Sequence, residues 1–252
     1  MLKKTLTTLA AGIALSIAAQ ASALADPVKN IVLVHGAFVD GSGWEPVTRI
    51  LDKAGYNVSI VQEPQTSLAD DVAATRRILA MQKGRSLLVG HSYGGFIISE
   101  AGKDPSVAGL VYIAAFQPEK GETLMSLSSK IPQASKGITE TSDHFLYLKP
   151  EVFHADFAAD LPKSQADLMA RSQVMPAAAI FSTPAQEPVW KTKPSWAMVA
   201  TEDRAINPDL ERFMSKRAES TTVEVKGSHA IYASQPEKVA ELIEKAARRV
   251  SQ

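Results

Sequence analysis

The feature of this sequence that most constrains its fold is the run Gly90-His91-Ser92-Tyr93-Gly94-Gly95. An apolar, strand-like segment at 86–89 precedes it, and a helix-like segment at 96–103 follows it. A serine on a sharp turn from strand to helix leaves no room for side chains two residues before and after it, which explains the flanking glycines. The run therefore predicts that Ser92 lies at the edge of a sheet and beside a helix N-terminus, where free N–H groups can stabilise an anion.

A second motif lies upstream, where the β-branched run 31–34 leads into His35-Gly36-Ala37-Phe38. In serine hydrolases built on such turns, one oxyanion donor is the backbone N–H of the residue after the nucleophile. The other donor comes from the loop after an earlier strand. We therefore expect the backbone N–H groups of Ala37 and Tyr93 to form an oxyanion hole.

Acid and base candidates follow two further strand-like segments. The segment 196–200 leads into Thr201-Glu202-Asp203, and the segment 223–225 leads into Gly227-Ser228-His229. The carboxyl ends of parallel strands meet at one edge of a sheet, so Ser92, Asp203 and His229 are expected to come together there. We predict that Ser92 is the nucleophile, His229 the base and Asp203 the acid that orients it. Glu202 and Glu119 remain alternatives for the acid.

Strand-like and helix-like segments alternate along the chain, which is typical of an α/β fold with about six parallel strands flanked by helices. The expected strands are 31–34, 58–61, 86–89, 109–114, 196–200 and 222–225. The expected helices are 44–54, 68–81, 96–103, 208–218 and 236–250, with Ser67, Asn207 and Ser234 as polar residues at their starts.

One segment, about 117–194, interrupts this alternation and is rich in proline and aromatic residues. Because it would leave and rejoin the sheet at the edge that holds Ser92, we expect a helical cap over that serine. Its aromatic residues could line a substrate pocket, or they could pack in a small core of the cap itself. The candidates for lining the pocket are Phe38, Phe116, Phe145 and Trp190.

These motifs, in the order serine, aspartate, histidine, resemble the α/β-hydrolase superfamily over nearly all of the chain after residue 28. They are most similar to the branch of plant methyl esterases, hydroxynitrile lyases and bacterial esterases. The resemblance implies the α/β-hydrolase fold with a cap inserted between sheet strands. Two positions differ from the lyases, which carry threonine where this chain has Gly36 and lysine where it has Ala230. Because a lyase needs a cation near the leaving cyanide, these differences favour a hydrolase.

The composition is that of a globular enzyme, with 45% hydrophobic and 21% charged residues. Basic and acidic residues number 27 each, so the charge balance does not suggest a nucleic-acid partner. The chain has no cysteine, which excludes disulfide and thiol chemistry. No metal or cofactor is expected, because His154-Ala155-Asp156 is an incomplete ligand set and the turn at Gly90 lacks the lysine of a phosphate-binding loop.

The N-terminus has the pattern of a secretory signal peptide. Lys3 and Lys4 precede an apolar stretch at 9–19, and small residues follow it. We predict cleavage after Ala25, with Ala23 as the alternative, so that 1–25 is the signal peptide and 26–252 the mature hydrolase domain in the periplasm or outside the cell. The alternative is an uncleaved membrane anchor; after cleavage no stable membrane insertion is expected.

The sequence thus predicts a carboxylic ester hydrolase that acts on small apolar esters through an acyl-enzyme. The same residues could serve lactone hydrolysis, perhydrolysis or cofactor-free oxygenation, and a non-catalytic ligand-binding receptor is a further alternative. The expected partner is a small-molecule ester. The identity of that ester and the oligomeric state are left open.

Overall fold

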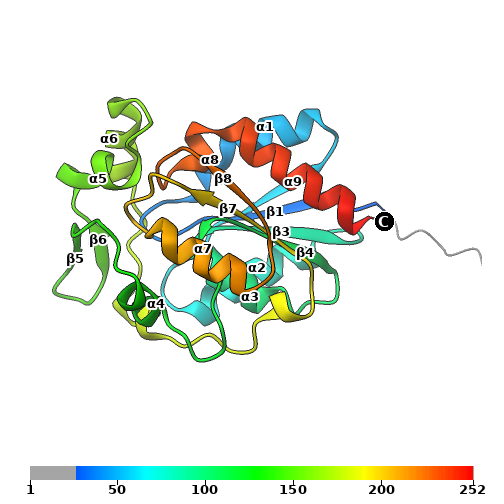
Figure 1. Ribbon diagram of the computed structural model, residues 1–252, viewed down its shortest axis with the longest axis horizontal. Coiled ribbons are helices and arrows are strands. Elements are labelled where there is room, and N and C mark those ends of the chain that lie inside the picture. The colour runs from blue at the N-terminus through cyan, green and yellow to red at the C-terminus, as the bar shows by residue number, and fades with distance from the viewer. Residues whose placement is uncertain (1–26, 252) are drawn as a thin grey trace, which may run out of the picture.

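The computed structural model describes residues 27–251. The predicted signal peptide, 1–25, lies outside the described residues. Six parallel strands form a sheet in the order β2-β1-β3-β4-β7-β8, which confirms the predicted α/β fold (Figure 1). The strands are β1 (Asn30–Val34), β2 (Asn57–Val61), β3 (Ser86–Ser92), β4 (Val107–Ala115), β7 (Ser195–Ala200) and β8 (Thr221–Val225).

Helices cover both faces of the sheet (Figure 1). One face holds α1 (Glu45–Lys53), α8 (Ile231–Ser234) and α9 (Pro236–Val250), and the other holds α2 (Leu68–Ala80), α3 (Gly94–Ala101) and α7 (Pro208–Arg217). The central strands β3 and β4 are buried at every position because helices cover both of their sides. The outer strands β2 and β8 are partly exposed. None of the helices within residues 27–251 combines the length and hydropathy needed to cross a lipid bilayer.

Polar residues begin two of the helices where the sequence predicts them. The Ser67 side chain accepts a hydrogen bond from the Asp70 amide at the start of α2, and Asn207 accepts one from the Asp209 amide at the start of α7. The prediction for Ser234 is wrong, because this residue ends α8 instead of beginning α9. Its hydroxyl donates to Asp160 Oδ2 at 2.8 Å.

The helices of the segment between β4 and β7 lie beside the carboxyl edge of the sheet (Figure 1). Its last residues run back to the amino end of β7, where Lys193 Nζ donates to Asp104 O and Val107 O. The expectation that the segment rejoins the sheet at the edge that holds Ser92 is wrong, because β7 is parallel to β4. Besides helices the segment contains an antiparallel pair of strands, which the sequence analysis did not predict because strands of three residues carry no readable alternation. Its elements are α4 (Leu124–Lys130), β5 (Ile138–Glu140), β6 (Leu146–Leu148), α5 (Pro150–Phe157), α6 (Lys163–Arg171) and the 3₁₀ turns η2 (Ala178–Ser182) and η3 (Val189–Lys191). We call this segment the cap. A further 3₁₀ turn, η1 (Gly41–Trp44), follows β1.

Candidate active site

Ser92 ends the central strand β3 in a strained turn. Its φ of 54° lies in the left-handed region, which non-glycine residues rarely adopt. The turn packs tightly on both sides: a Cβ added at Gly90 would lie 2.6 Å from Gly94 O, and one at Gly94 would lie 2.7 Å from His35 O. Only glycine fits at these two positions, as the sequence pattern indicated.

Ser92 belongs to a buried chain of hydrogen bonds. The distance between Ser92 Oγ and His229 Nε2 is 2.9 Å, and His229 Nδ1 lies 2.5 Å from Asp203 Oδ2. The other carboxylate oxygen of Asp203 accepts from the amides of Ala205 and Ile206 at 2.7 and 2.9 Å. These two amides fix the carboxylate, which in turn orients the imidazole. The arrangement can move a proton from Ser92 to His229.

The two alternative acids have other partners. Glu202 forms a 3.5 Å ion pair with Lys226, and Glu119 forms a 2.7 Å ion pair with Lys191. Among these three acidic candidates, only Asp203 forms an ion pair with His229. The structure thus brings Asp203 to the histidine and leaves the other two carboxylates elsewhere.

Ser92 opens onto a small cavity of about 50 Å³. Ala37 and Tyr93 line it, and within residues 27–251 their backbone N–H groups donate no hydrogen bond to the protein. Two amides without acceptors therefore lie beside the serine hydroxyl. Such a pair can receive the negative charge that develops on a carbonyl oxygen during attack by Ser92.

The aromatic candidates for the pocket divide into two pairs. Phe38 and Phe116 line the cavity at Ser92, whereas Phe145 and Trp190 do not. Trp190 donates from Nε1 to Pro118 O at 2.8 Å, and its ring centroid lies 5.9 Å from Arg217 Cζ. The Phe145 backbone forms an isolated β-bridge with Ala177.

Two other aromatic residues of the cap line the cavity at Ser92 instead of Phe145 and Trp190. Phe181 lines the cavity and packs on Phe38 with ring centroids 6.1 Å apart, and Phe157 packs edge-on against His229 at 4.7 Å. Both rings are visible in the sequence as cap aromatics. Their spacing along the chain does not reveal which of them face Ser92.

The two positions that distinguish this chain from the lyases are closely packed. A Cβ added at Gly36 would lie 2.6 Å from Ser92 Cβ, so a threonine does not fit there without a change of conformation. Ala230 is fully buried, and its amide donates to Phe157 O at 2.8 Å. Neither position supplies a polar or charged side chain to the cavity.

The histidines beside the sequence motifs form hydrogen bonds with the backbone. His35 Nδ1 lies 2.9 Å from Gly36 O. Burial, and then the proximity of His229, lowers the pKa of His91 well below its ordinary value. A neutral His91 therefore donates its Nε2–H to the backbone oxygen of His229 at 2.9 Å, which fixes the loop that carries the candidate base.

A second buried carboxyl group, Glu211 of α7, lies next to Asp203. Burial raises its pKa well above 4.5, and the charge of Asp203 raises it further. Folded protein therefore binds more protons than unfolded protein above the ordinary glutamate pKa, so Glu211 makes the free energy of unfolding fall as pH rises.

Replacement of Glu211 by glutamine is expected to remove this pH dependence, because the amide is neutral at every pH and similar in shape. We expect the Tm of Glu211→Gln, measured relative to that of the wild type, to rise as the pH is raised from 5 to 8. Thermal unfolding followed by circular dichroism at several pH values measures the difference. Parallel curves for the two proteins would contradict the inferred protonation of Glu211.

The incomplete ligand set in the cap has structural partners. His154 Nε2 lies 3.0 Å from Leu161 O, and Asp156 accepts from Arg204 Nε at 2.9 Å. Over the part of the chain that the structure describes, no three acidic, histidine or cysteine side chains are grouped as metal ligands would be.

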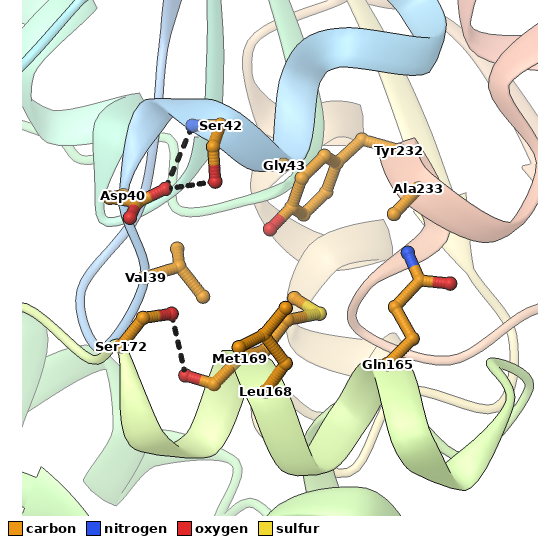
Figure 2. Close-up of a pocket in the computed structure, with 10 residues that line it drawn as sticks. All are labelled: Val39, Asp40, Ser42, Gly43, Gln165, Leu168, Met169, Ser172, Tyr232 and Ala233. Atoms are coloured by element: carbon orange, nitrogen blue, oxygen red, sulfur yellow. Dashed lines mark hydrogen bonds between the residues drawn. The ribbon is translucent and has the colours of Figure 1, made fainter.

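A second cavity, of about 280 Å³, lies between α6 of the cap and the loop around η1 (Figure 2). Leu168 and Met169 of α6 face Val39 and the Tyr232 ring across it (Figure 2). It is larger than the cavity at Ser92, but neither Ser92 nor His229 lines it. The candidate reaction site is therefore the smaller cavity.

Comparison with known proteins agrees with this geometry. The model of the "Alpha/beta hydrolase family" matches residues 31–242. This chain belongs to the alpha/beta hydrolase family. The fold and the order of the serine, aspartate and histidine motifs follow the pattern of that family, as the sequence resemblance implied.

Individual relatives of this alpha/beta hydrolase include named esterases and hydrolases. A pyrethroid hydrolase of Sphingobium wenxiniae is 28% identical over 249 residues, which cover 86% of each chain. The crystal structure of a pyrethroid hydrolase from Sphingobium faniae has a TM-score of 0.75 at 26% identity and covers 87% of this chain and 97% of its own. Polyneuridine aldehyde esterase shares the fold, with a TM-score of 0.75 at 16% identity over 87% of this chain and 99% of its own.

Proposed function

We propose that this alpha/beta hydrolase is a serine-dependent carboxylic ester hydrolase that acts on small, apolar esters. The observation that carries the proposal is the hydrogen-bonded chain from Ser92 through His229 to Asp203, which opens onto a cavity with two unpaired amides. The names of the two pyrethroid hydrolases among the relatives support this reaction class.

The proposed reaction begins when Ser92 Oγ attacks the ester carbonyl carbon while His229 Nε2 accepts the hydroxyl proton. The carbonyl oxygen becomes an oxyanion that the amides of Ala37 and Tyr93 stabilise. His229 then gives its proton to the leaving alcohol, and an acyl-enzyme forms on Ser92. Water, deprotonated by His229, attacks this acyl group and releases the acid.

The shape of the site supports an ester with one short side. The cavity of about 50 Å³ has room for only a small group beside Ser92. A more open groove of about 630 Å³ adjoins it and shares Gln133, Ile138 and Phe181 with the cavity. We propose that the larger, apolar side of the ester lies along this groove, which also presents Met125 and Leu146.

The sequence of the N-terminus supports a periplasmic or secreted location as part of this proposal. The signal-peptide pattern consists of Lys3 and Lys4, the short apolar stretch at 9–19, and the small residues before Ala25. Mass spectrometry of the N-terminus of the protein after export would test it, with a mature chain beginning at Asp26 as the expected result.

A covalent label tests the reaction class directly. We expect a fluorophosphonate probe to modify Ser92, because only an activated serine attacks phosphorus at a useful rate. Peptide mass spectrometry locates the label, and a series of p-nitrophenyl esters from acetate to octanoate measures turnover. The Ser92→Ala variant should neither be labelled nor turn over the esters.

The same experiment separates the proposal from its alternatives. A folded protein that binds esters without labelling or turnover would be a ligand-binding receptor. Labelling of Ser92 without ester turnover would favour another use of the same residues, such as lactone hydrolysis. Either result would contradict ester hydrolysis as the main activity.

A further inference from the structure

A buried carboxylate, Asp71, lies beneath the candidate active site and takes no part in the proposed proton transfers. It lies in the first turn of α2 and is fully buried. Each carboxylate oxygen accepts one hydrogen bond: Oδ1 accepts from the Gln65 amide at 2.8 Å, and Oδ2 accepts from the Tyr93 hydroxyl at 2.7 Å. Asp71 therefore joins two segments of chain that are far apart in the sequence.

The Gln65 side of this link holds the loop that carries Ala37. Gln65 Nε2 donates to Gly36 O at 3.1 Å and to Val39 O at 3.3 Å, so one amide group binds a carbonyl on each side of Ala37 and Phe38. Phe38 has a φ of 66°, in the left-handed region. The loop therefore has a strained conformation that the Gln65 side chain holds in place.

The Tyr93 side of the link holds the second amide. Tyr93 follows Ser92 directly, and the residue is 2% exposed. Because the side chain and the backbone N–H belong to the same residue, fixing the hydroxyl at α2 limits how far the amide can rotate. Both amides that line the cavity at Ser92 are thus tied to the same carboxylate.

We propose that Asp71 is a positioning residue that sets the separation of the Ala37 and Tyr93 amides and so shapes the oxyanion hole. This inference rests on the proposed ester hydrolysis. Donors to an oxyanion act only when they are held within about 0.5 Å of the productive geometry. The backbone pairing of β1 with β3 ends at Val34 and Gly90. Beyond that point the link through Asp71 connects the loop that carries Ala37 to the Ser92 turn, so one shared anchor fixes both donors.

An ionised carboxylate suits this role because both of its partners are donors. Burial raises the pKa of Asp71, but the hydrogen bonds from Tyr93 and Gln65 oppose that rise. An apolar replacement would leave the Tyr93 hydroxyl and the Gln65 amide buried without acceptors. Asparagine would retain the shape but supply one donor in place of an acceptor, so one of the two bonds would be lost or reversed.

The test compares Asp71→Asn with Asp70→Asn in the same helical turn. Asp70 is exposed, and its carboxylate accepts hydrogen bonds from the Ser67 and Thr66 hydroxyls and from no other group in the described part of the chain. Its replacement removes a charge from the same helix end without touching the link. We expect Asp71→Asn to lower kcat for p-nitrophenyl esters by about 10- to 100-fold while KM changes little, because oxyanion stabilisation acts in the transition state. Asp70→Asn should retain the wild-type kcat.

A second measurement separates positioning from general destabilisation. Phenylboronic acid forms a tetrahedral adduct with an active serine, so its inhibition constant should weaken in parallel with kcat in Asp71→Asn. Rates are normalised to the fraction of sites that a fluorophosphonate titrates, which corrects for misfolded protein. Tyr93→Phe breaks the same link from its other end and should show the same pattern. It also keeps the test available if Asp71→Asn does not fold.

The losses of kcat in Asp71→Asn and Tyr93→Phe should not multiply when the two substitutions are combined. If Asp71 acts through the Tyr93 hydroxyl, the double variant should lose little more than Asp71→Asn alone. An unchanged kcat in both single variants, or a change in KM alone, would overturn the role of Asp71 and leave the proposed hydrolysis intact. A wild type that neither turns over esters nor binds the boronate would overturn both.

Discussion

Replacement of His229 by alanine is expected to lower kcat for ester hydrolysis by about 10⁴- to 10⁶-fold. Within residues 27–251 the imidazole is the only base that hydrogen-bonds to Ser92 Oγ, at 2.9 Å, and without it the serine hydroxyl is a weak nucleophile. Steady-state kinetics with p-nitrophenyl esters measure the loss. KM should change far less, because His229 acts on the proton transfers and not on binding of the ester.

The decisive comparison is with Ser92→Ala and with the double variant that combines Ser92→Ala and His229→Ala. Side chains that act as one catalytic unit are not additive, so kcat of the double variant should be no lower than kcat of either single variant. Losses that multiply would show that Ser92 and His229 work independently, against the proposed mechanism. Circular dichroism of each variant checks that the fold is unchanged.

Replacement of Gly95 by alanine is expected to prevent stable folding. An added Cβ would lie 1.9 Å from Phe116 O and 2.9 Å from Phe116 C, which are backbone atoms just after the central strand β4. Overpacking in a rigid core costs about 1 to 3 kcal/mol, and a contact this close lies at or beyond the upper end of that range. Since domains are stable by only about 5 to 15 kcal/mol, urea unfolding should show a large loss or no folded protein at all.

Gly109→Ala is a graded control for that experiment. Its added Cβ would meet Trp196 Cζ3, Val250 Cγ1 and Pro194 O at 3.1 to 3.2 Å, so small shifts of the neighbours can relieve the contact. We expect a loss of free energy of unfolding well below that of Gly95→Ala. Equal losses in the two variants would contradict the argument from the Phe116 carbonyl.

Much of the fold could be predicted because the sequence patterns of its strands and helices are local, each lying within a short stretch of chain. Six runs of apolar residues alternate with helix-forming segments, and the helices that the structure shows at α2, α7 and α9 follow the predicted ranges within a few residues. The positions of Ser92, Asp203 and His229 just past strand ends were also readable, because parallel strands place such residues at one edge.

The interior of the site could not be predicted in the same way. Phe181, and not Phe145, faces Ser92 because of how the cap packs, and spacing along an irregular segment does not encode that. Asp70 and Asp71 look alike in sequence, as two acids at a helix start. Only the packing of α2 shows that one is exposed and the other is buried under the Ser92 turn.

The cap leaves the sheet at β4 and returns at β7, and these two strands are direct neighbours, paired from Leu110 and Ser195 onward. The pairing of β4 with β7 therefore involves no residue of the cap. The cap is nevertheless tied to the serine site, because Phe157 O accepts from the Ala230 amide and Asp160 accepts from the Ser228 amide, on either side of His229. Changes elsewhere in the cap, at residues such as Ile138 and Phe181, can therefore reshape the cavity at Ser92 while the sheet and the His229 loop keep their contacts.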